Sequence, residues 1–127
     1  ALFYETAIRK NEFLSLKVED LNLGSRYLRI KAKRGKEERL IPLSDTFMVL
    51  ARNYLEKYTP GIFLVEGISR GPYSPEAIWT LWKDALKSNE LPHNTSLNFI
   101  RQSRIKHWLD EGVPRSFIRE WIGTDSL

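Results

Sequence analysis

Apolar and polar residues alternate most regularly at positions 27–32. The apolar residues fall on one side of an extended strand and the charged residues on the other, which predicts one buried and one basic face. The buried face would carry Leu28, Ile30 and Ala32, and the basic face Tyr27, Arg29, Lys31 and Lys33. An apolar segment at 39–43 follows a charged tip, and Pro42 favours a strand end or a sheet edge there. The two segments together predict a β-hairpin.

Apolar residues at helical spacing predict five or six helices around this hairpin. The predicted helices cover residues up to 8, 10–17, 45–58, 74 to about 88, 97–110 and 114–122. The candidate N-caps are Ser44 and Asp45 for the third helix and Asn94, Thr95 or Ser96 for the fifth, while Gly112 and Gly123 can end the last two. Residues 18–25 predict a turn and residues 62–65 a short strand. The expected fold class is mainly α with a small antiparallel β-hairpin or sheet.

The composition indicates one globular domain. The chain has 127 residues, 42% of them hydrophobic, and its tryptophans (Trp79, Trp82, Trp108 and Trp121) are expected in the core. The absence of cysteine excludes disulfides and thiolate metal sites, and two histidines make a poor metal site. No apolar run approaches the roughly 20 residues of a membrane span. The chain begins without Met inside an apolar helical pattern, so we expect part of a longer protein, by default cytoplasmic.

The net charge of +4 is only mildly basic, so the distribution of charge is more informative than its sum. One basic cluster accompanies the hairpin and a second lies in the C-terminal helices. The first contains Arg26, Arg29, Lys31, Lys33, Arg34, Lys36 and Arg39, and the second contains Arg101, Arg104, Lys106, Arg115 and Arg119. Two separated clusters predict a basic surface assembled by folding, not a basic tail.

Three cations at the ends of predicted elements are candidates for chemistry. Arg9 lies between two helices, Lys33 in the hairpin tip, and Arg101 one turn into a late helix. Each also has an ordinary structural interpretation. Lys33 can be a solvated charge, and Arg101 can be a surface helix residue. Arg9 follows an apolar run, so a buried guanidinium there requires an anionic partner, which is either Glu5 or Glu12 or a ligand.

Four segments of the chain, taken in order, resemble the motifs of the tyrosine recombinases, the phage integrase and Xer family. They are Arg9 with Glu12; Lys33 with Lys36, Glu38, Arg39 and the ending LIPL; Asn98 to Arg101, where the family has His-x-x-Arg; and Ile122-Gly123-Thr124, where it has Leu-Gly-His. The hairpin tip is one residue longer than the family pattern. The resemblance covers nearly the whole chain and implies the tyrosine recombinase catalytic-domain (DNA breaking-rejoining) fold.

The resemblance also implies roles for these residues. Arg9 and Arg101 would hold the non-bridging oxygens of a DNA phosphate, and Lys33 would protonate the leaving 5′-oxygen as a general acid. A tyrosine oxygen would attack the phosphodiester and form a 3′-phosphotyrosine, with no metal or other cofactor. The supporting residues would be Glu12, which orients Arg9, and Arg34, Lys36 and Arg104, which contact the DNA.

Two residues depart from the family pattern. Asn98 stands where the family usually has His, and Thr124 where it has His or Trp; both can donate a hydrogen bond, but Asn98 cannot exchange a proton as His can. The tyrosines at positions 4, 27, 54, 58 and 73 do not match the position of the nucleophile, which is expected beyond Leu127. Residues 1–127 would then be a single, partial catalytic domain that lacks the C-terminal nucleophile segment.

Three functional hypotheses follow. In the first, the parent protein is a site-specific recombinase or integrase of duplex DNA, nucleoid-associated and tetrameric on paired sites, with residues 1–127 monomeric alone. The second is a catalytically degenerate or truncated DNA-binding module of the same fold. The third is an RNA-binding or partner-docking basic domain with chance similarity. A tyrosine in the next helix would favour the first over the second. The target site, host element and accessory proteins are not specified by this sequence.

Overall fold

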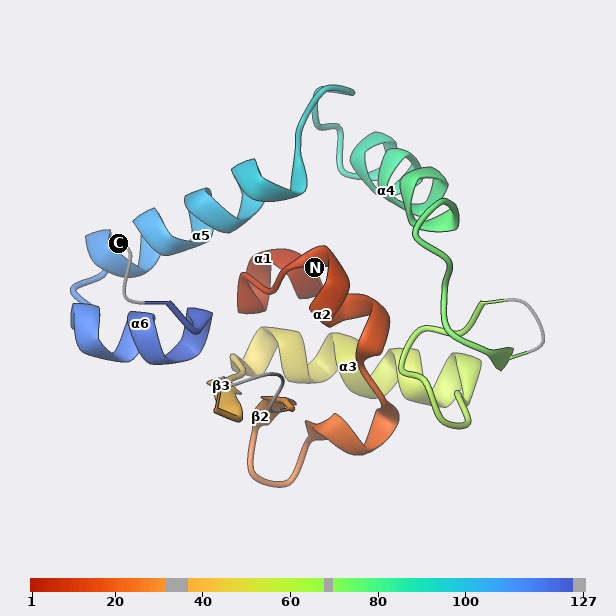
Figure 1. Ribbon diagram of the computed structural model, residues 1–127, viewed down its shortest axis with the longest axis horizontal. Helices are drawn as coiled ribbons and strands as arrows, with labels where there is room; N and C mark the ends of the chain where they lie inside the picture. The colour runs from red at the N-terminus through yellow and green to blue at the C-terminus, as the bar shows by residue number, and fades with distance from the viewer. Residues whose placement is uncertain (32–36, 68–69, 125–127) are drawn as a thin grey trace.

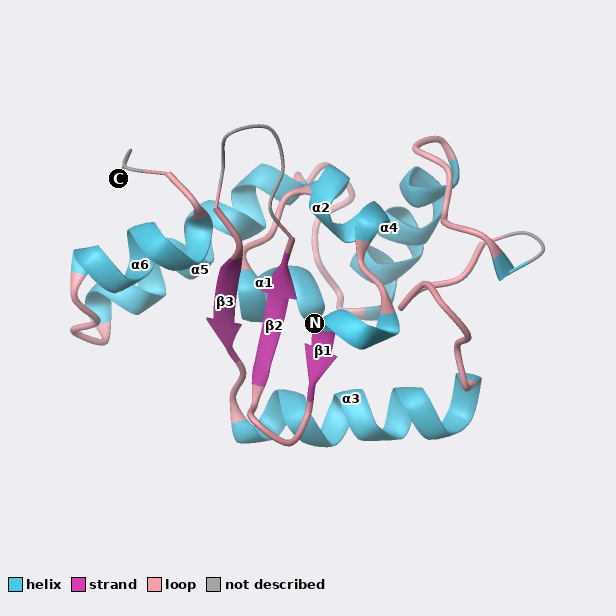
Figure 2. Cartoon of the chain, turned by 60° about the horizontal axis from the view of Figure 1, so that its bottom comes forward, coloured by secondary structure: helices cyan, strands magenta, loops and turns pink. Residues whose placement is uncertain are grey.

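The computed structural model describes residues 1–31, 37–67 and 70–124. In this part of the chain, helices surround a small antiparallel sheet, as expected from the sequence (Figure 1). Helix α3 runs beneath the sheet, and the last two helices lie together beyond the β3 edge (Figure 2). None of the described helices is long and apolar enough to cross a membrane.

The sheet has the strand order β1-β2-β3, with β1 at Leu21–Asn22, β2 at Tyr27–Ile30 and β3 at Arg39–Pro42. The predicted hairpin is therefore confirmed, with Leu28 paired to Ile41. Both side chains are fully buried, because the alternation places them on the face that meets the helices. The expected turn at 18–25 instead contains a 3-10 helix, Val18–Asp20, and the short strand β1. Two residues are too few for alternation to reveal a strand.

Two short helices open the chain, α1 at Leu2–Thr6 and α2 at Lys10–Ser15. Ala7 ends α1 in the left-handed conformation, with φ 54°, so the chain turns sharply before α2 begins. Beyond the sheet, α3 spans Asp45–Tyr58, and the Ser44 side chain accepts a hydrogen bond from the Phe47 amide, as predicted for its cap.

Three helices complete the described chain: α4 at Ala77–Ser88, α5 at Leu97–Asp110 and α6 at Arg115–Ile122. Ser96 is the residue that caps α5, where its hydroxyl accepts from the Phe99 amide at 3.0 Å. Gly123 ends α6 in the left-handed conformation, with φ 74°. The predicted strand at 62–65 is wrong, since only an isolated bridge between Lys17 and Phe63 forms there.

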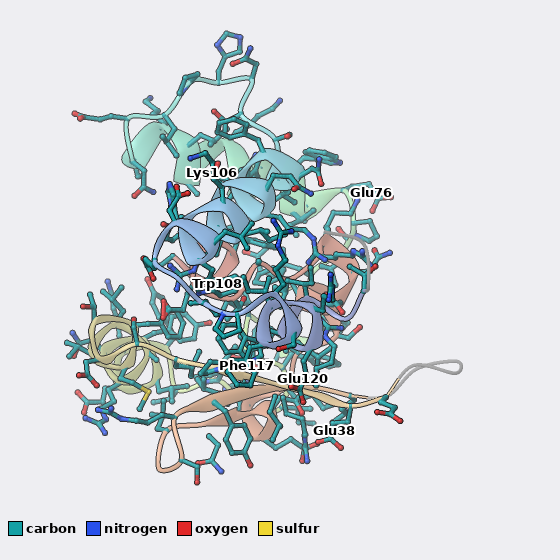
Figure 3. The ribbon with its side chains drawn as sticks, turned by 90° about the vertical axis from the view of Figure 1, so that its left-hand side faces the viewer. Glu38, Glu76, Lys106, Trp108, Phe117 and Glu120 are labelled. Atoms are coloured by element: carbon teal, nitrogen blue, oxygen red, sulfur yellow. The ribbon has the colours of Figure 1, made fainter. Side chains whose placement is uncertain are left out.

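The apolar residues form two cores. The larger one joins the sheet to α2, α3 and α4, and the smaller one packs α5 and α6 against the end of α1. The buried members of the smaller core are Ala7, Ile105, Trp108, Ile118 and Ile122. Trp108 lies between α5 and α6 (Figure 3), and Trp121 packs against both cores. Trp79 departs from the prediction: it is 53% exposed and its ring lies beneath the Lys10 ammonium.

Truncation of Ile118 tests the smaller core. Ile118 is fully buried, so Ile118→Ala should lower the free energy of unfolding by about 2–5 kcal/mol in a urea titration. Val49→Ala on α3 is the matched control, because Val49 is 57% exposed and its loss should cost less than about 1 kcal/mol. Equal losses for the two variants would contradict the assignment of the core.

Candidate active site

Arg101 is the buried centre of the site. Its side chain is 7% exposed on α5, one turn after the Ser96 cap. The guanidinium donates to the carbonyl of Ala7, at the end of α1, and to that of Ile122, at the end of α6. The carbonyl ends of helices carry partial negative charge, which favours a cation there. Burial, followed by the positive charge of Arg9, lowers the pKa of Arg101 to about 10, so it remains charged at neutral pH.

Glu12 joins α2 to the hairpin. Its carboxylate accepts a hydrogen bond from the Arg9 backbone amide at 2.9 Å and two from the guanidinium of Arg39, one of them at 3.2 Å. Burial alone would raise the pKa of this carboxyl, but these hydrogen bonds and the charges of Arg39 and Arg101 together hold its pKa below the usual value. The predicted supporting role of Glu12 therefore has a geometric basis: it fixes the backbone at Arg9.

Arg9 is exposed, and neither carboxylate proposed as its structural partner binds its guanidinium. Glu5 accepts from the Ser44 amide at 2.7 Å and from the Ser44 hydroxyl at 3.2 Å. Glu12 is occupied by Arg39. Within the described residues, no acidic side chain forms an ion pair with Arg9. Neither of the two carboxylates that the sequence offered as structural partners binds the Arg9 guanidinium, and its binding to a ligand stays a prediction.

Asn98 lies at the start of α5, and Thr124 follows the end of α6. Asn98 is exposed in the first turn of α5, one turn before Arg101. Thr124 is half-buried and directly follows Gly123, which contacts Arg39 so closely that an added Cβ would lie 2.7 Å from the Arg39 Cδ. Thr124 also lines a polar hollow between β3 and α6, together with Glu38 and Glu120, which lie on the same side of the molecule (Figure 3).

Arg104 is held by aromatic rings. Its guanidinium lies 4.9 Å from the ring centre of Tyr4 and 4.6 Å from that of Trp108. The Tyr4 hydroxyl is hydrogen bonded to His107, one turn further along α5. These contacts stabilise the packing of α5 on α1 through cation–π attraction. The DNA contact expected of Arg104 stays a prediction.

The basic face predicted for the hairpin is largely neutralised in the described residues. Arg29 pairs with the buried Asp20 at 3.1 Å, and Lys31 with Glu19 at 2.6 Å. Arg26 forms an ion pair with Asp45, and Arg39 forms one with Glu12. The predicted alternation of buried and charged residues along β2 is observed, and the fold adds carboxylates that pair with these cations. Lys33, Arg34 and Lys36, which were expected to act in catalysis and DNA binding, lie outside the described residues.

Three guanidinium groups and one carboxylate therefore meet at the junction of α2, β3, α5 and α6. Arg9, Arg101 and Glu12 were predicted site residues, whereas Arg39 had no predicted role and was marked only by its place in the hairpin motif. Two arginine side chains in one place suit an oxyanion, since each guanidinium can donate two parallel hydrogen bonds to it. The excess of positive charge makes phosphate binding the chemistry that this arrangement supports.

The ion pair of Glu12 makes the stability of the site pH-dependent. Because the pKa of Glu12 is lower in the folded chain than in the unfolded chain, its contribution is complete above the unfolded value and is lost as the pH falls through the folded value. Glu12→Gln should therefore unfold at a lower temperature than the wild type at pH 7, and the gap should shrink towards pH 3. Thermal unfolding across this range measures it; a gap that is constant with pH would contradict the contribution of Glu12.

The fold is similar to those of solved recombinases and integrases. The XerA recombinase superposes with a TM-score of 0.86 at 18% identity, over 98% of this chain and 46% of that one. The Tn1549 transposon integrase, solved with transposon right end DNA, superposes with a TM-score of 0.80 at 14% identity, over 98% of this chain and 49% of that one. These similarities confirm the expected fold.

Sequence comparison shows the same relationship. The tyrosine recombinase XerD of Staphylococcus saprophyticus is 28% identical, and XerA of Pyrococcus horikoshii is 30% identical, each over 99% of this chain. The chain spans about half the length of these relatives, 45% in both cases. The model of the phage integrase family matches residues 1–127. The chain belongs to the phage integrase family.

Proposed function

We propose that residues 1–127 are part of the catalytic domain of a site-specific DNA recombinase or integrase. The observation that carries this proposal is the Arg9 guanidinium, which forms no ion pair within the described residues and lies near the buried Arg101. Glu12 is held between them by the Arg39 guanidinium and the Arg9 backbone amide. The ligand of the site would be a phosphodiester of duplex DNA. Solved relatives such as the Tn1549 integrase, bound to transposon DNA, support this choice of ligand.

Arg101 and Arg9 would both donate hydrogen bonds to the phosphate, Arg101 from a fixed position and Arg9 from the surface. The carbonyls of Ala7 and Ile122 accept hydrogen bonds from two of the five N–H donors of Arg101. These bonds fix the guanidinium in place, and the remaining donors can bind a phosphate. Arg9 is exposed and would complete the clamp when DNA arrives. Donors that are already positioned stabilise the charge that develops on the non-bridging oxygens without further reorganisation.

The proposed reaction conserves the energy of the phosphodiester bond. A tyrosine oxygen attacks the phosphorus, the bond from phosphorus to the 5′-oxygen breaks, and Lys33 gives its proton to that leaving oxygen. The reverse attack by a 5′-hydroxyl on the 3′-phosphotyrosine rejoins a strand. Asn98 and Thr124 would donate hydrogen bonds to the phosphate, and no metal or other cofactor takes part.

The nucleophile would come from outside these 127 residues. Tyr4 is bonded to His107, and Tyr54 donates to the Leu64 carbonyl at 2.6 Å. Tyr27 accepts from Asn22, far from the arginines in the fold. In the described part of the chain, no tyrosine hydroxyl contacts Arg9 or Arg101. Residues 1–127 would thus bind and polarise a phosphate without forming the covalent intermediate.

A DNA-binding module without activity is the second candidate. It is favoured by Asn98 and Thr124, which occupy the positions of the family's His-x-x-Arg and Leu-Gly-His histidines. Loss of one positioned donor typically costs about 100- to 1000-fold in rate, so the substitutions would slow a recombinase without abolishing its activity. For the active form, we propose a homo-tetramer on paired sites, with residues 1–127 monomeric alone, at the nucleoid of the cytoplasm.

A covalent-adduct assay tests the active form. The full-length protein, given a nicked suicide substrate of its own attachment site, should form a protein–DNA adduct. Arg9→Ala and Arg101→Ala should each abolish the adduct and leave most of the duplex affinity intact, because other cations also contact the backbone.

Two further outcomes of the assay are informative. No adduct from the wild-type full-length protein would contradict catalysis and favour the binding module. An adduct formed by residues 1–127 alone would show that the nucleophile lies within them, against the proposal.

Salt dependence tests the DNA contact itself. If about five phosphates are neutralised, the slope of log affinity against log salt concentration should lie between about −4 and −5. Lys36→Ala and Arg34→Ala should weaken binding by a similar factor on all sequences. Lys31→Ala is the matched control and should have a smaller effect, since Glu19 already neutralises Lys31. A flat salt dependence would exclude a phosphate-binding role.

A further inference from the structure

Arg39 binds two structural elements with one side chain. Its side chain is 11% exposed, where β3 passes α2 and the end of α6. The Nε atom donates to the Trp121 carbonyl at 3.1 Å, and both terminal nitrogens donate to Glu12. The β3 strand is thereby connected to the last turn of α6 on one side and to the first turn of α2 on the other.

These contacts reach both arginines of the phosphate site. Glu12, which Arg39 holds, accepts from the backbone amide of Arg9. At the end of α6, Arg39 donates a hydrogen bond to the carbonyl of Trp121. Arg101 donates to the carbonyl of the next residue, Ile122, at 3.2 Å. Two guanidinium groups therefore bind consecutive carbonyls at the end of one helix.

Gly123 shows how closely Arg39 is packed. A Cβ at this position would lie 2.7 to 2.9 Å from the Cδ, Nε and Cζ atoms of Arg39, closer than any real contact. The backbone at Gly123 also has φ 74°, which disfavours other residues. Because residue 123 is a glycine, the backbone can pass in contact with the Arg39 guanidinium where α6 ends and Thr124 follows.

We propose that Arg39 is a positioning residue of the phosphate site, which fixes Arg9 through Glu12 and fixes the exit from α6 through the Trp121 carbonyl. The proposal deepens the function above and rests on it. Arg39 itself would not contact the phosphate; it would hold the groups that do.

The geometry requires a guanidinium and not only a positive charge. Lysine presents one ammonium on a flexible stem, whereas Arg39 uses nitrogens on both edges of a planar group. Arg39→Lys should therefore keep the charge but lose either the bond to Trp121 or one of the bonds to Glu12. Displacement of a reacting group by about 1 Å can cost about 100-fold in rate.

The experiment uses the full-length protein and a nicked suicide substrate at saturating concentration. Arg39→Lys should lower the single-turnover rate of adduct formation by about 10- to 100-fold. The dissociation constant for the intact duplex should change by less than about threefold, since the bulk of affinity comes from other phosphate contacts. An unchanged rate per folded molecule would overturn the proposal.

Arg29→Lys is the matched control. Arg29 is also an arginine of the sheet, bound at two nitrogens to the buried Asp20 and ion-paired with Glu38, and it does not contact Arg9, Glu12 or Arg101. A merely structural role for Arg39 predicts that both variants lose thermal stability and that neither loses rate once folded. A positioning role predicts a selective rate loss in Arg39→Lys.

A double-mutant cycle tests the route through Glu12. If Arg39 acts on Arg9 through Glu12, then Arg39→Gln and Glu12→Gln should be non-additive, and the double variant should be no slower than the slower single variant. Multiplied effects would contradict this route. They would restrict the role of Arg39 to the end of α6.

Hydrogen exchange provides a readout that does not depend on activity. In the full-length protein, Arg39→Lys should reduce the exchange protection of two backbone amides. They are the amide of Arg9, which donates a hydrogen bond to Glu12, and the amide of Gly123, which donates to the Arg119 carbonyl. Arg29→Lys should leave the protection of both amides unchanged. Unchanged protection would overturn the positioning role even if the enzyme is active. Absence of an adduct from the wild type would instead contradict the proposed function alone.

Discussion

The interaction on which the site depends is the sharing of one carboxylate by several cations. Glu12 accepts from the backbone of Arg9 and from the side chain of Arg39, and its charge also offsets the effect of burial on Arg101. With Glu12 present, three guanidinium groups can lie together in a partly buried place. Because Arg9 and Arg101 form no ion pair within the described residues, both guanidinium groups would remain available to an incoming oxyanion.

The small core formed by α5, α6 and the end of α1 supports this arrangement. Ile118, Ile122 and Trp108 hold α6 against α5 with almost no exposed surface, so the carbonyl at the end of α6 stays within reach of Arg101. The left-handed caps at Ala7 and Gly123 present the two helix ends to the same side chain. A guanidinium bound between helix ends is both a structural contact and a preorganised anion binder.

The cations of the described part of the sheet are paired with carboxylates. Arg29 and Lys31 would form a basic stripe in an isolated hairpin, but Asp20 and Glu19 from the preceding 3-10 helix neutralise them. Exposed pairs of this kind contribute little stability, although the buried carboxylate of Asp20 needs its partner. Within the described residues, Arg29 and Lys31 are therefore paired, whereas Arg9 is exposed without an ion pair.

The sequence by itself determined the helices, their caps and the hairpin. These depend on local periodicity and on single residues such as Ser96 and Gly123, whose preferences act within one turn. The resemblance of the motifs also predicted that Arg9, Glu12 and Arg101 belong to one site. Only the tertiary structure decided which charges meet. In the folded chain, Glu5 is hydrogen bonded to Ser44, Glu12 to Arg39 and Asp20 to Arg29. Trp79 lies on the surface and not in the core. Pairing between segments far apart in the chain depends on distances after folding, which local spacing does not encode.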